Sequence, residues 1–224
     1  MGLGHIRELH GCGRLETVEM YTYVSHKGAE RMRLWTIQTK EAWEHAEKLG
    51  VLEFNEIADK EIDDWFRPAY NWMAGQLEER VRGYPCNKYP IWAWYHPKPD
   101  LRRSGHLPRD TTGVRVEFLV DSDRVLLSDF EAWHAVLNCW YLSLSEEEGE
   151  NWDERSERAG IKGGWENWPP PPLFKEEILE SWERIFDPEL LNKRPEWIGG
   201  ETIQACIEKI YVNEVINITY FKAR

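Results

Sequence analysis

The feature that most constrains the fold of this chain is a strict alternation of apolar residues in its middle, at every second position from Val114 to Val120. Successive side chains of a strand point to opposite faces, so this period of two predicts a β-strand with one face against a core. A second strand is predicted in YPIWAWY, residues 89–95, where bulky side chains fall on both faces and both faces are expected to be covered. The segment between them, residues 96–113, holds three prolines and two glycines and is predicted to be an irregular loop.

The segments before this centre show a strand pattern followed by helix patterns. RLWTIQ, residues 33–38, is predicted to be a strand. Thr39 and Gly50 are residue types that begin and end a helix, so a helix is expected between them. A longer amphipathic helix is predicted from Ala58 to Arg82, with Pro68 either bending it or opening its second half.

Behind the central strands, Ser128 and Glu131 have the spacing of a capping box, which predicts the start of a further helix. Residues 145–164 are acidic and contain several glycines, so they are predicted to form a solvated loop. KEEILESWERIF, residues 175–186, has a helical apolar period.

Strand patterns return at the C-terminus, in residues 202–212 and 215–221, which a turn at Asn213 could join as a hairpin. In the first of them, Gln204 and Glu208 are expected to point to the same face. Helices between early strands and a late cluster of strands indicate an α+β class with a mixed or antiparallel sheet and several amphipathic helices.

The length of the chain indicates one globular domain, which we expect to cover residues 32–224. Residues 1–31 lack a sustained period and are predicted to be a poorly ordered extension. Two origins are considered for it, an over-extended start codon and a regulatory arm.

Composition excludes several classes of function. The net charge of −12 argues against broad binding to a nucleic-acid backbone, which needs a basic face. No window approaches eighteen apolar residues, so no membrane span is expected. The four cysteines form no C-x-x-C pair, which argues against structural zinc and favours a cytoplasmic protein with free thiols. Thirteen tryptophans predict an aromatic-rich core, with a ring-stacking ligand cleft as the alternative.

The central loop supplies the strongest candidates for binding a ligand. Its cations could hold a phosphate or a carboxylate, and arginine offers two parallel donors for such a group. The alternative is that they form surface ion pairs with some of the forty acidic residues. No metal-ligand spacing and no Gly-rich phosphate loop is found, so no metal site is predicted. The candidate phosphate-binding residues are Lys98, Arg102, Arg103, His106 and Arg109.

One set of segments carries a resemblance to a known family. They are LWTIQ, then YPIWAWY followed by PKPDLR and SGHLP, then RVEF leading to LLSDFEAWHAVLN, and a terminal IQA before KI and ITYFKAR. In these the chain resembles an uncharacterised bacterial family, domain of unknown function 3841, over residues 32–224. The resemblance implies that the domain starts at Met32, and it implies no chemistry.

A second resemblance is architectural, to ADP-ribosyltransferase-like domains, which bind NAD in a cleft between two half-sheets. It rests on the strand at 33–38 with its helix, the aromatic strand at 89–95 and a late strand carrying Glu. Carried over, it implies Tyr89 or Tyr95 and Glu208, with Gln204 as a second candidate, as catalytic residues. Thr36 stands where that superfamily has His or Arg, so Arg33, Gln38 or a loop residue would have to hold the nicotinamide ribose. Thr36 and Gln38 are therefore included among the candidate ligand-binding residues.

Two functional hypotheses result. The first is a transferase that uses NAD or another nucleotide. The second is a non-catalytic protein that recognises a small anionic ligand or a protein partner.

Overall fold

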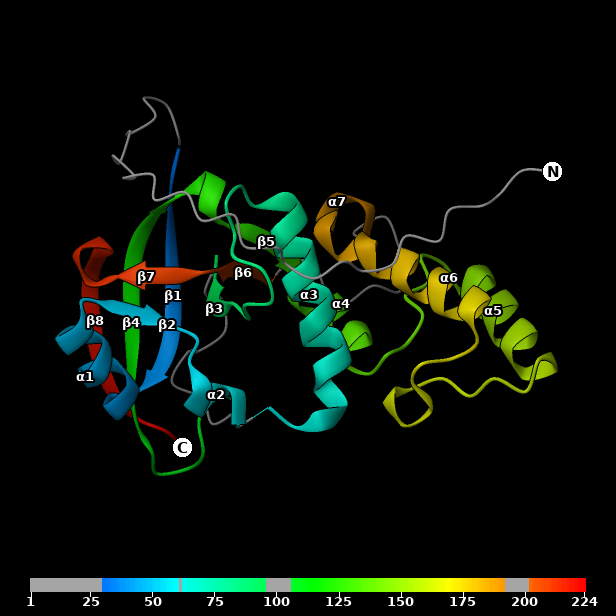
Figure 1. Ribbon diagram of the computed structural model, residues 1–224, viewed down its shortest axis with the longest axis horizontal. Coiled ribbons are helices and arrows are strands. Elements are labelled where there is room, and N and C mark those ends of the chain that lie inside the picture. Colours follow the sequence, from blue (N-terminus) through cyan, green and yellow to red (C-terminus); the bar gives the residue numbers. More distant parts are fainter. Residues whose placement is uncertain (1–29, 61, 96–105, 192–201) are drawn as a thin grey trace, which may run out of the picture.

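The computed structural model describes residues 30–60, 62–95, 106–191 and 202–224, which form an α+β fold (Figure 1). The strands are β1 (Arg31–Thr39), β2 (Val51–Glu53), β3 (Ile91–Trp94), β4 (Thr112–Asp121), β5 (Leu126–Asp129), β6 (Ile203–Ile207), β7 (Lys209–Tyr211) and β8 (Val215–Lys222). The helices are α1 (Lys40–Leu49), α2 (Glu56–Lys60), α3 (Arg67–Arg80), α4 (Phe130–Leu137), α5 (Glu146–Arg158), α6 (Pro172–Trp182) and α7 (Pro188–Leu191). The predicted extension at 1–31 lies outside the described residues except for its last two.

The main sheet consists of two halves that are joined by a single paired position. Its order is β5-β6-β3-β1-β4-β8, and every neighbouring pair is antiparallel. β1 and β4 pair along their length, from Arg31 opposite Asp121 to Thr39 opposite Gly113. β1 and β3, in contrast, pair at one position, Trp35 opposite Trp94. Beyond that position the half-sheets β8-β4-β1 and β3-β6-β5 part.

Two hydrophobic cores lie on either side of the second half-sheet. The first is enclosed by the main sheet, α1 and the two-stranded sheet of β2 and β7, and it buries the alternating apolar face of β4 completely, as the sequence predicts. The second lies under α3, α4 and α6. β6 contributes to both, because Ala205 and Ile207 point into the first core and Cys206 into the second.

The predicted helix signals near the N-terminus are confirmed in part. Thr39 caps α1 by accepting a hydrogen bond from the Ala42 amide at 3.1 Å, and Gly50 ends it with φ of 77°, a conformation that glycine adopts without strain. The long helix predicted at 58–82 is instead divided into α2, a 3₁₀ turn and α3. Pro68 stands in the first turn of α3, where its missing N–H costs nothing.

Three predictions about the later elements are wrong. The N-cap of α4 is Asp129 rather than Ser128, because the Asp129 carboxylate accepts from the Ala132 amide at 2.7 Å. Residues 146–158, predicted as loop, form α5, whose N-cap is Ser145 and whose first turn carries three glutamates that complement the helix dipole. β8 forms no hairpin with β7 and pairs with β4 instead.

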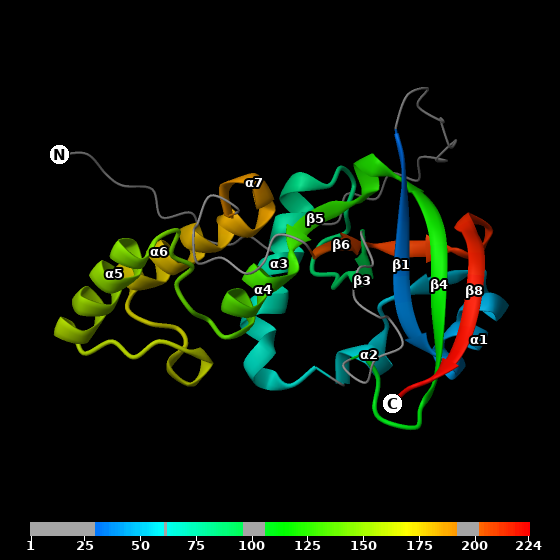
Figure 2. The ribbon, with the colours of Figure 1, turned by 180° about the vertical axis from the view of Figure 1, so that it is seen from behind.

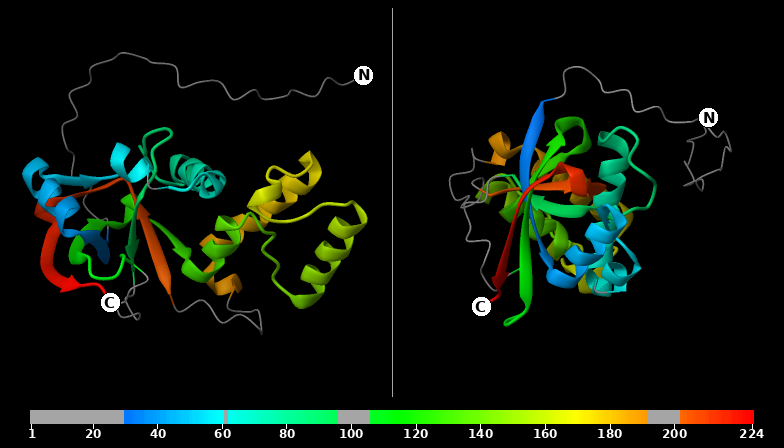
Figure 3. Two further views of the ribbon diagram at one scale, coloured as in Figure 1. Left: turned by 90° about the horizontal axis from the view of Figure 1, so that it is seen from below. Right: turned by 90° about the vertical axis from the view of Figure 1, so that its left-hand side faces the viewer.

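The elements separate into a sheet end and a helical end. Seen from behind, β1, β4 and β8 lie at one side of the molecule, and α5 and α6 lie at the other (Figure 2). The view from below agrees with this separation and places the C-terminus at the sheet end (Figure 3, left). Within the described ranges, no helix has both the length and the apolar character required to cross a bilayer.

Candidate functional site

A cleft of about 660 Å³ opens where β1 and β3 part. This volume is within the range of small-molecule pockets. Its walls come from the end of β1, from α1, from β2 with the segment that follows it, and from the start of β3. The polar lining residues are Gln38, Thr39, Glu41, His45, Glu53 and Asn55, and the apolar ones include Leu49, Phe54, Pro90, Ile91, Trp92 and Leu107.

The gap between the two half-sheets is bridged by a side chain. The Thr36 hydroxyl donates to the carbonyl oxygen of Trp92 at 2.8 Å, where a ladder hydrogen bond would otherwise continue. The same hydroxyl oxygen accepts from Nε2 of Gln38 at 3.0 Å. Thr36 is 1% exposed, so this chain of hydrogen bonds is shielded from water. Thr36 and Gln38, both predicted as ligand-binding residues, therefore meet at the parting of the strands, and Gln38 lines the cleft.

The cleft contains a carboxylate that is held ionised. Nζ of Lys88 donates to Glu53 Oε2 at 2.5 Å, and this hydrogen bond lowers the pKa of the Glu53 carboxyl below its ordinary value. Lys88 also lies 3.8 Å from Oε1 of Glu208, which Nζ of Lys209 approaches at 2.9 Å. Glu208, predicted to be catalytic, is not among the residues that line the cleft. It lies behind the lining, in an ion pair with Lys88.

The predicted Tyr89 also lies behind the lining. Its ring packs edge-on against Phe54, with 5.4 Å between ring centroids, and in the same way against Tyr70. Its hydroxyl donates to Oδ1 of Asn71 at 2.6 Å. Tyr89 thus supports the aromatic wall that Phe54 presents to the cleft.

The structure places the other described candidates elsewhere. Gln204 is 4% exposed, and its Nε2 donates to the hydroxyl of Ser128 at 3.0 Å between β6 and β5. Tyr95 donates its amide to the carbonyl of Ile203 at 2.9 Å and packs against the first core. Arg109 has a side chain that is 84% exposed and lies beside the C-terminal residues.

His106 belongs to a different aromatic group, on the far side of β3. Its ring lies 5.7 Å from that of Trp94, which in turn contacts Phe130 at 4.7 Å. His106 is thereby separated from the cleft, although its neighbour Leu107 lines it. Lys98, Arg102 and Arg103 lie outside the described residues.

Several lining residues escaped the sequence reasoning. Glu53 and Asn55 follow the α1 helix in the short segment VLEFN, and His45 lies on α1 itself. The alternation of polar and apolar residues in VLEFN was the available signal. Lys88, which orients Glu53, directly precedes the aromatic strand and could have been found from that position.

A second concavity, of about 450 Å³, lies at the helical end between α4, α5 and α6. Its aromatic walls are already packed by the chain itself: Tyr141 stacks on Trp152 at 4.3 Å, and Trp168 stacks on Trp182 at 5.3 Å. No group of three or more potential metal ligands is found among the residues that the structure describes. The half-sheet cleft is therefore the better candidate for a ligand site.

Comparison with known proteins gives one match. The family model described as Domain of unknown function (DUF3841) matches residues 33–216, which is most of the chain. No curated protein and no solved structure matches the chain, so the likeness to ADP-ribosyltransferases receives no support from these comparisons. The segments that suggested the first family lie within this range, except for the last of them, ITYFKAR at residues 218–224. The chain therefore belongs to the family Domain of unknown function (DUF3841).

Proposed function

We propose that this protein binds a small molecule with a planar, nitrogen-bearing ring, such as the base of a nucleoside or of NAD, in the half-sheet cleft. The observation that carries the proposal is the cleft itself, a concavity of about 660 Å³ with an aromatic wall and a few convergent polar groups at the parting of β1 and β3. Phe54 supplies ring surface on which a flat ligand could pack, whereas the ring of Trp92 packs against Tyr70 and Trp133 in the second core.

The chemistry of the lining favours the base of such a ligand over its phosphate. Glu41 and Glu53 bring two carboxylates, and no Lys or Arg is among the lining residues that the structure describes. Gln38 adds a carboxamide oxygen that can accept a hydrogen bond, whereas the carboxamide oxygen of Asn55 already accepts from the Ala58 amide at 3.1 Å. An acidic, acceptor-rich cleft favours neutral or cationic N–H groups, so a free anion is the less suitable occupant.

The experiment is a calorimetric titration of the purified chain with adenosine, cytidine, AMP and NAD. We expect at least one of them to bind, and Gln38→Ala to weaken that binding about ten-fold, because a buried hydrogen bond to the ligand is lost. Gln76→Ala, on α3 and away from the cleft, is the control of the same residue type. Failure of all four ligands, or equal affinity of the Gln38 and Gln76 variants, contradicts the proposal.

Glycosyl transfer from NAD is a second candidate function, favoured by the position of Glu53. An ionised carboxylate inside the cleft could stabilise the positive charge that develops on a ribose when its base leaves. Release of nicotinamide from NAD, abolished in Glu53→Gln, is the expected result. Glu208→Gln, one ion pair further back, is expected to retain most of that activity; the opposite order of the two variants would make Glu208 the catalytic residue.

A cytoplasmic location is part of this proposal, because nucleotides are abundant there. The buried Cys139 and Cys206 are free thiols, which suits a reducing compartment.

A further inference from the structure

We infer that Gln38 turns its carboxamide oxygen toward the ligand, so that the cleft selects rings with an amino group over rings with an oxygen at the same position. This inference rests on the proposed function and names the class of base that the cleft would take. Adenine and cytosine belong to the selected class, and hypoxanthine and uracil to the rejected one.

The orientation of Gln38 follows from the direction of two hydrogen bonds. The Trp92 carbonyl oxygen can only accept, so the Thr36 hydroxyl, 2.8 Å away, must donate its one hydrogen to it. The Thr36 oxygen is then an acceptor for Gln38 at 3.0 Å, and only the NH₂ end of the Gln38 carboxamide can donate. The carboxamide is thereby fixed in one of its two orientations, with its oxygen at the other end.

The environment makes this orientation costly to reverse. A reversed carboxamide would set its oxygen against the Thr36 oxygen, whose hydrogen is committed to Trp92, and two acceptors would then face each other. Thr36 is 1% exposed, so no bulk water can reach it to relieve the conflict. Among the described residues, no donor is placed at hydrogen-bond distance from the Gln38 carboxamide oxygen. That oxygen is available to an N–H group in the cleft.

The Glu53 carboxylate is a second hydrogen-bond acceptor on the cleft. Glu53 is kept ionised by Lys88, and an ionised carboxylate can only accept. Glu41 brings a further carboxylate to the same lining. A ligand whose ring edge carries an exocyclic amino group meets complementary acceptors, whereas a keto oxygen in its place meets like partial charge.

The test measures two matched pairs of nucleosides by calorimetry, adenosine against inosine and cytidine against uridine. The members of each pair differ in an amino group against an oxygen, and the neighbouring ring nitrogen carries a hydrogen only in the oxygen member. The amino member, which offers its exocyclic N–H to the Gln38 oxygen without bringing a keto oxygen beside it, is expected to bind about ten-fold tighter whichever ring size the cleft accepts. In Thr36→Val the hydroxyl is replaced by a methyl group of similar size, Gln38 can reverse, and the preference is expected to fall close to one. Thr36→Ser keeps the hydroxyl and is expected to keep the preference.

The outcomes separate this inference from the proposed function. If none of the four nucleosides binds, the inference fails, and the proposed function fails with it only if AMP and NAD do not bind either. If nucleosides bind without preference for the amino member, or if Thr36→Val keeps the full preference, the ligand site stands and the orientation of Gln38 is refuted. Thermal unfolding of both Thr36 variants shows whether a lost preference reflects lost folding, and Thr36→Ser provides the folded comparison.

Discussion

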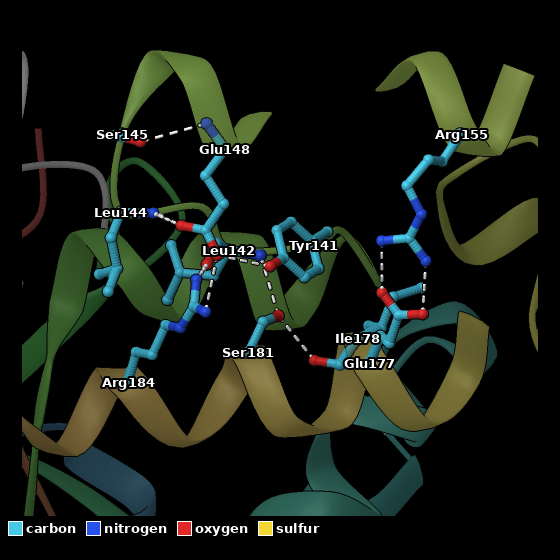
Figure 4. A network of polar contacts seen from close by, with 10 residues as sticks. All are labelled: Tyr141, Leu142, Leu144, Ser145, Glu148, Arg155, Glu177, Ile178, Ser181 and Arg184. Atoms are coloured by element: carbon cyan, nitrogen blue, oxygen red, sulfur yellow. Dashed lines mark hydrogen bonds and ion pairs between the residues drawn. The ribbon is translucent and has the colours of Figure 1, made fainter. Parts of the chain in front are cut away.

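The sheet end and the helical end of this molecule both have a concavity, but they differ in whether the polar groups there hydrogen-bond to one another. At the helical end the polar groups satisfy one another: Glu148 accepts from the Tyr141 hydroxyl, the Leu144 amide and Arg184, at 2.6 to 2.8 Å (Figure 4). At the sheet end, Gln38 and Glu53 keep acceptor atoms on a cleft. The difference teaches that closed polar networks hold helices together, whereas acceptors left at a parting of strands suit a ligand.

The aromatic residues divide in the same way. At the helical end Trp182 is fully buried, stacks on Trp168, meets Trp72 edge-on and donates Nε1–H to the carbonyl of Trp140 at 2.7 Å. Its rings thus fill space and cross-link α3, α4 and α6. At the cleft, Phe54 is only partly buried and lines the cavity, while the ring of Trp92 packs against Trp133 at 4.8 Å in the second core. Most of the tryptophan content is therefore explained by packing, which the sequence-based expectation of an aromatic core anticipates.

The largest expected effect is at the helical end. Trp182→Ala should lower the free energy of unfolding by about 3–5 kcal/mol, because it removes a fully buried ring and leaves a cavity. Urea unfolding measures it, and Trp140→Ala, at a site 53% exposed, serves as the control with a far smaller loss. Nucleoside affinity of the folded fraction should not change. A large loss of affinity would show that the two ends do not act separately.

A smaller effect is expected from the closed network itself. Burial of Glu148 opposes its ionisation, but hydrogen bonds from Arg184, Tyr141 and the Leu144 amide outweigh burial and lower the pKa of its carboxyl. Glu148→Gln should therefore cost about 1–2 kcal/mol of stability near pH 7. The carboxylate contributes stability above its unfolded pKa of about 4.5, and that contribution is lost as the pH falls through the lower folded pKa.

The measurement for this network is urea unfolding of wild type and Glu148→Gln from pH 7 down to about pH 3, below the ordinary carboxyl pKa. The difference between them should shrink toward the acid end. Glu150→Gln, an exposed site on the same helix, is the matched control. A difference that stays constant over this range would mean that the carboxylate charge at Glu148 does not contribute.

Replacing Lys88 should change the pKa of Glu53 in the cleft more than it changes the stability of the fold. The ion pairs of Lys88 with Glu53 and Glu208 are partly exposed, so Lys88→Met should cost no more than about 1 kcal/mol. The pKa of Glu53 should rise, because the hydrogen bond that lowers it is removed. Carboxyl titration by NMR measures this rise, with Lys48→Met on α1 as the control. An unchanged Glu53 titration would contradict the ion pair.

The smallest expected effect is at Arg109. Its side chain is 84% exposed and outside the cleft lining, so Arg109→Ala should change stability by less than about 0.5 kcal/mol. Nucleoside and AMP affinity should stay the same within error. A ten-fold loss of affinity for AMP alone, measured by calorimetry, would show that Arg109 contacts the ligand. The binding site would then extend beyond the cleft at the parting of the strands.

Local patterns predicted much of the fold and little of the site. The alternation from Val114 to Val120, the Thr39 cap and the Gly50 stop are local signals, and each is found in the structure. The acidic residues 146–158 were mistaken for loop because their glycines and charge masked the Ser145 cap, which accepts from the Glu148 amide. The α+β class followed from the order of the elements, whereas the neighbours of β6 and β8 depend on pairings that no local pattern encodes.

The candidate site needed three segments to meet, and this is why sequence reasoning found only part of it. Gln38 and Thr36 were singled out through the architectural resemblance, by their place on the first strand, and both lie at the parting of the sheet. Glu53 and Lys88 are 35 residues apart and were passed over, because only the pairing of β3 beside β1 brings them together. Gln204 and Glu208 were expected on one face of one strand, but β6 ends at Ile207 and each found a different partner.

The C-terminal strands have a consequence for synthesis of the chain. β6 inserts between β5 and β3, β7 pairs with β2, and β8 extends the sheet beyond β4, so a stretch of some twenty residues delivers three strands to three separate places. β3 is synthesised more than a hundred residues before β6, the strand with which it pairs in the folded sheet. During synthesis, the edge of β3 that later pairs with β6 therefore stays unpaired and exposed. A chaperone that binds exposed aromatic segments would bind the chain at this stage.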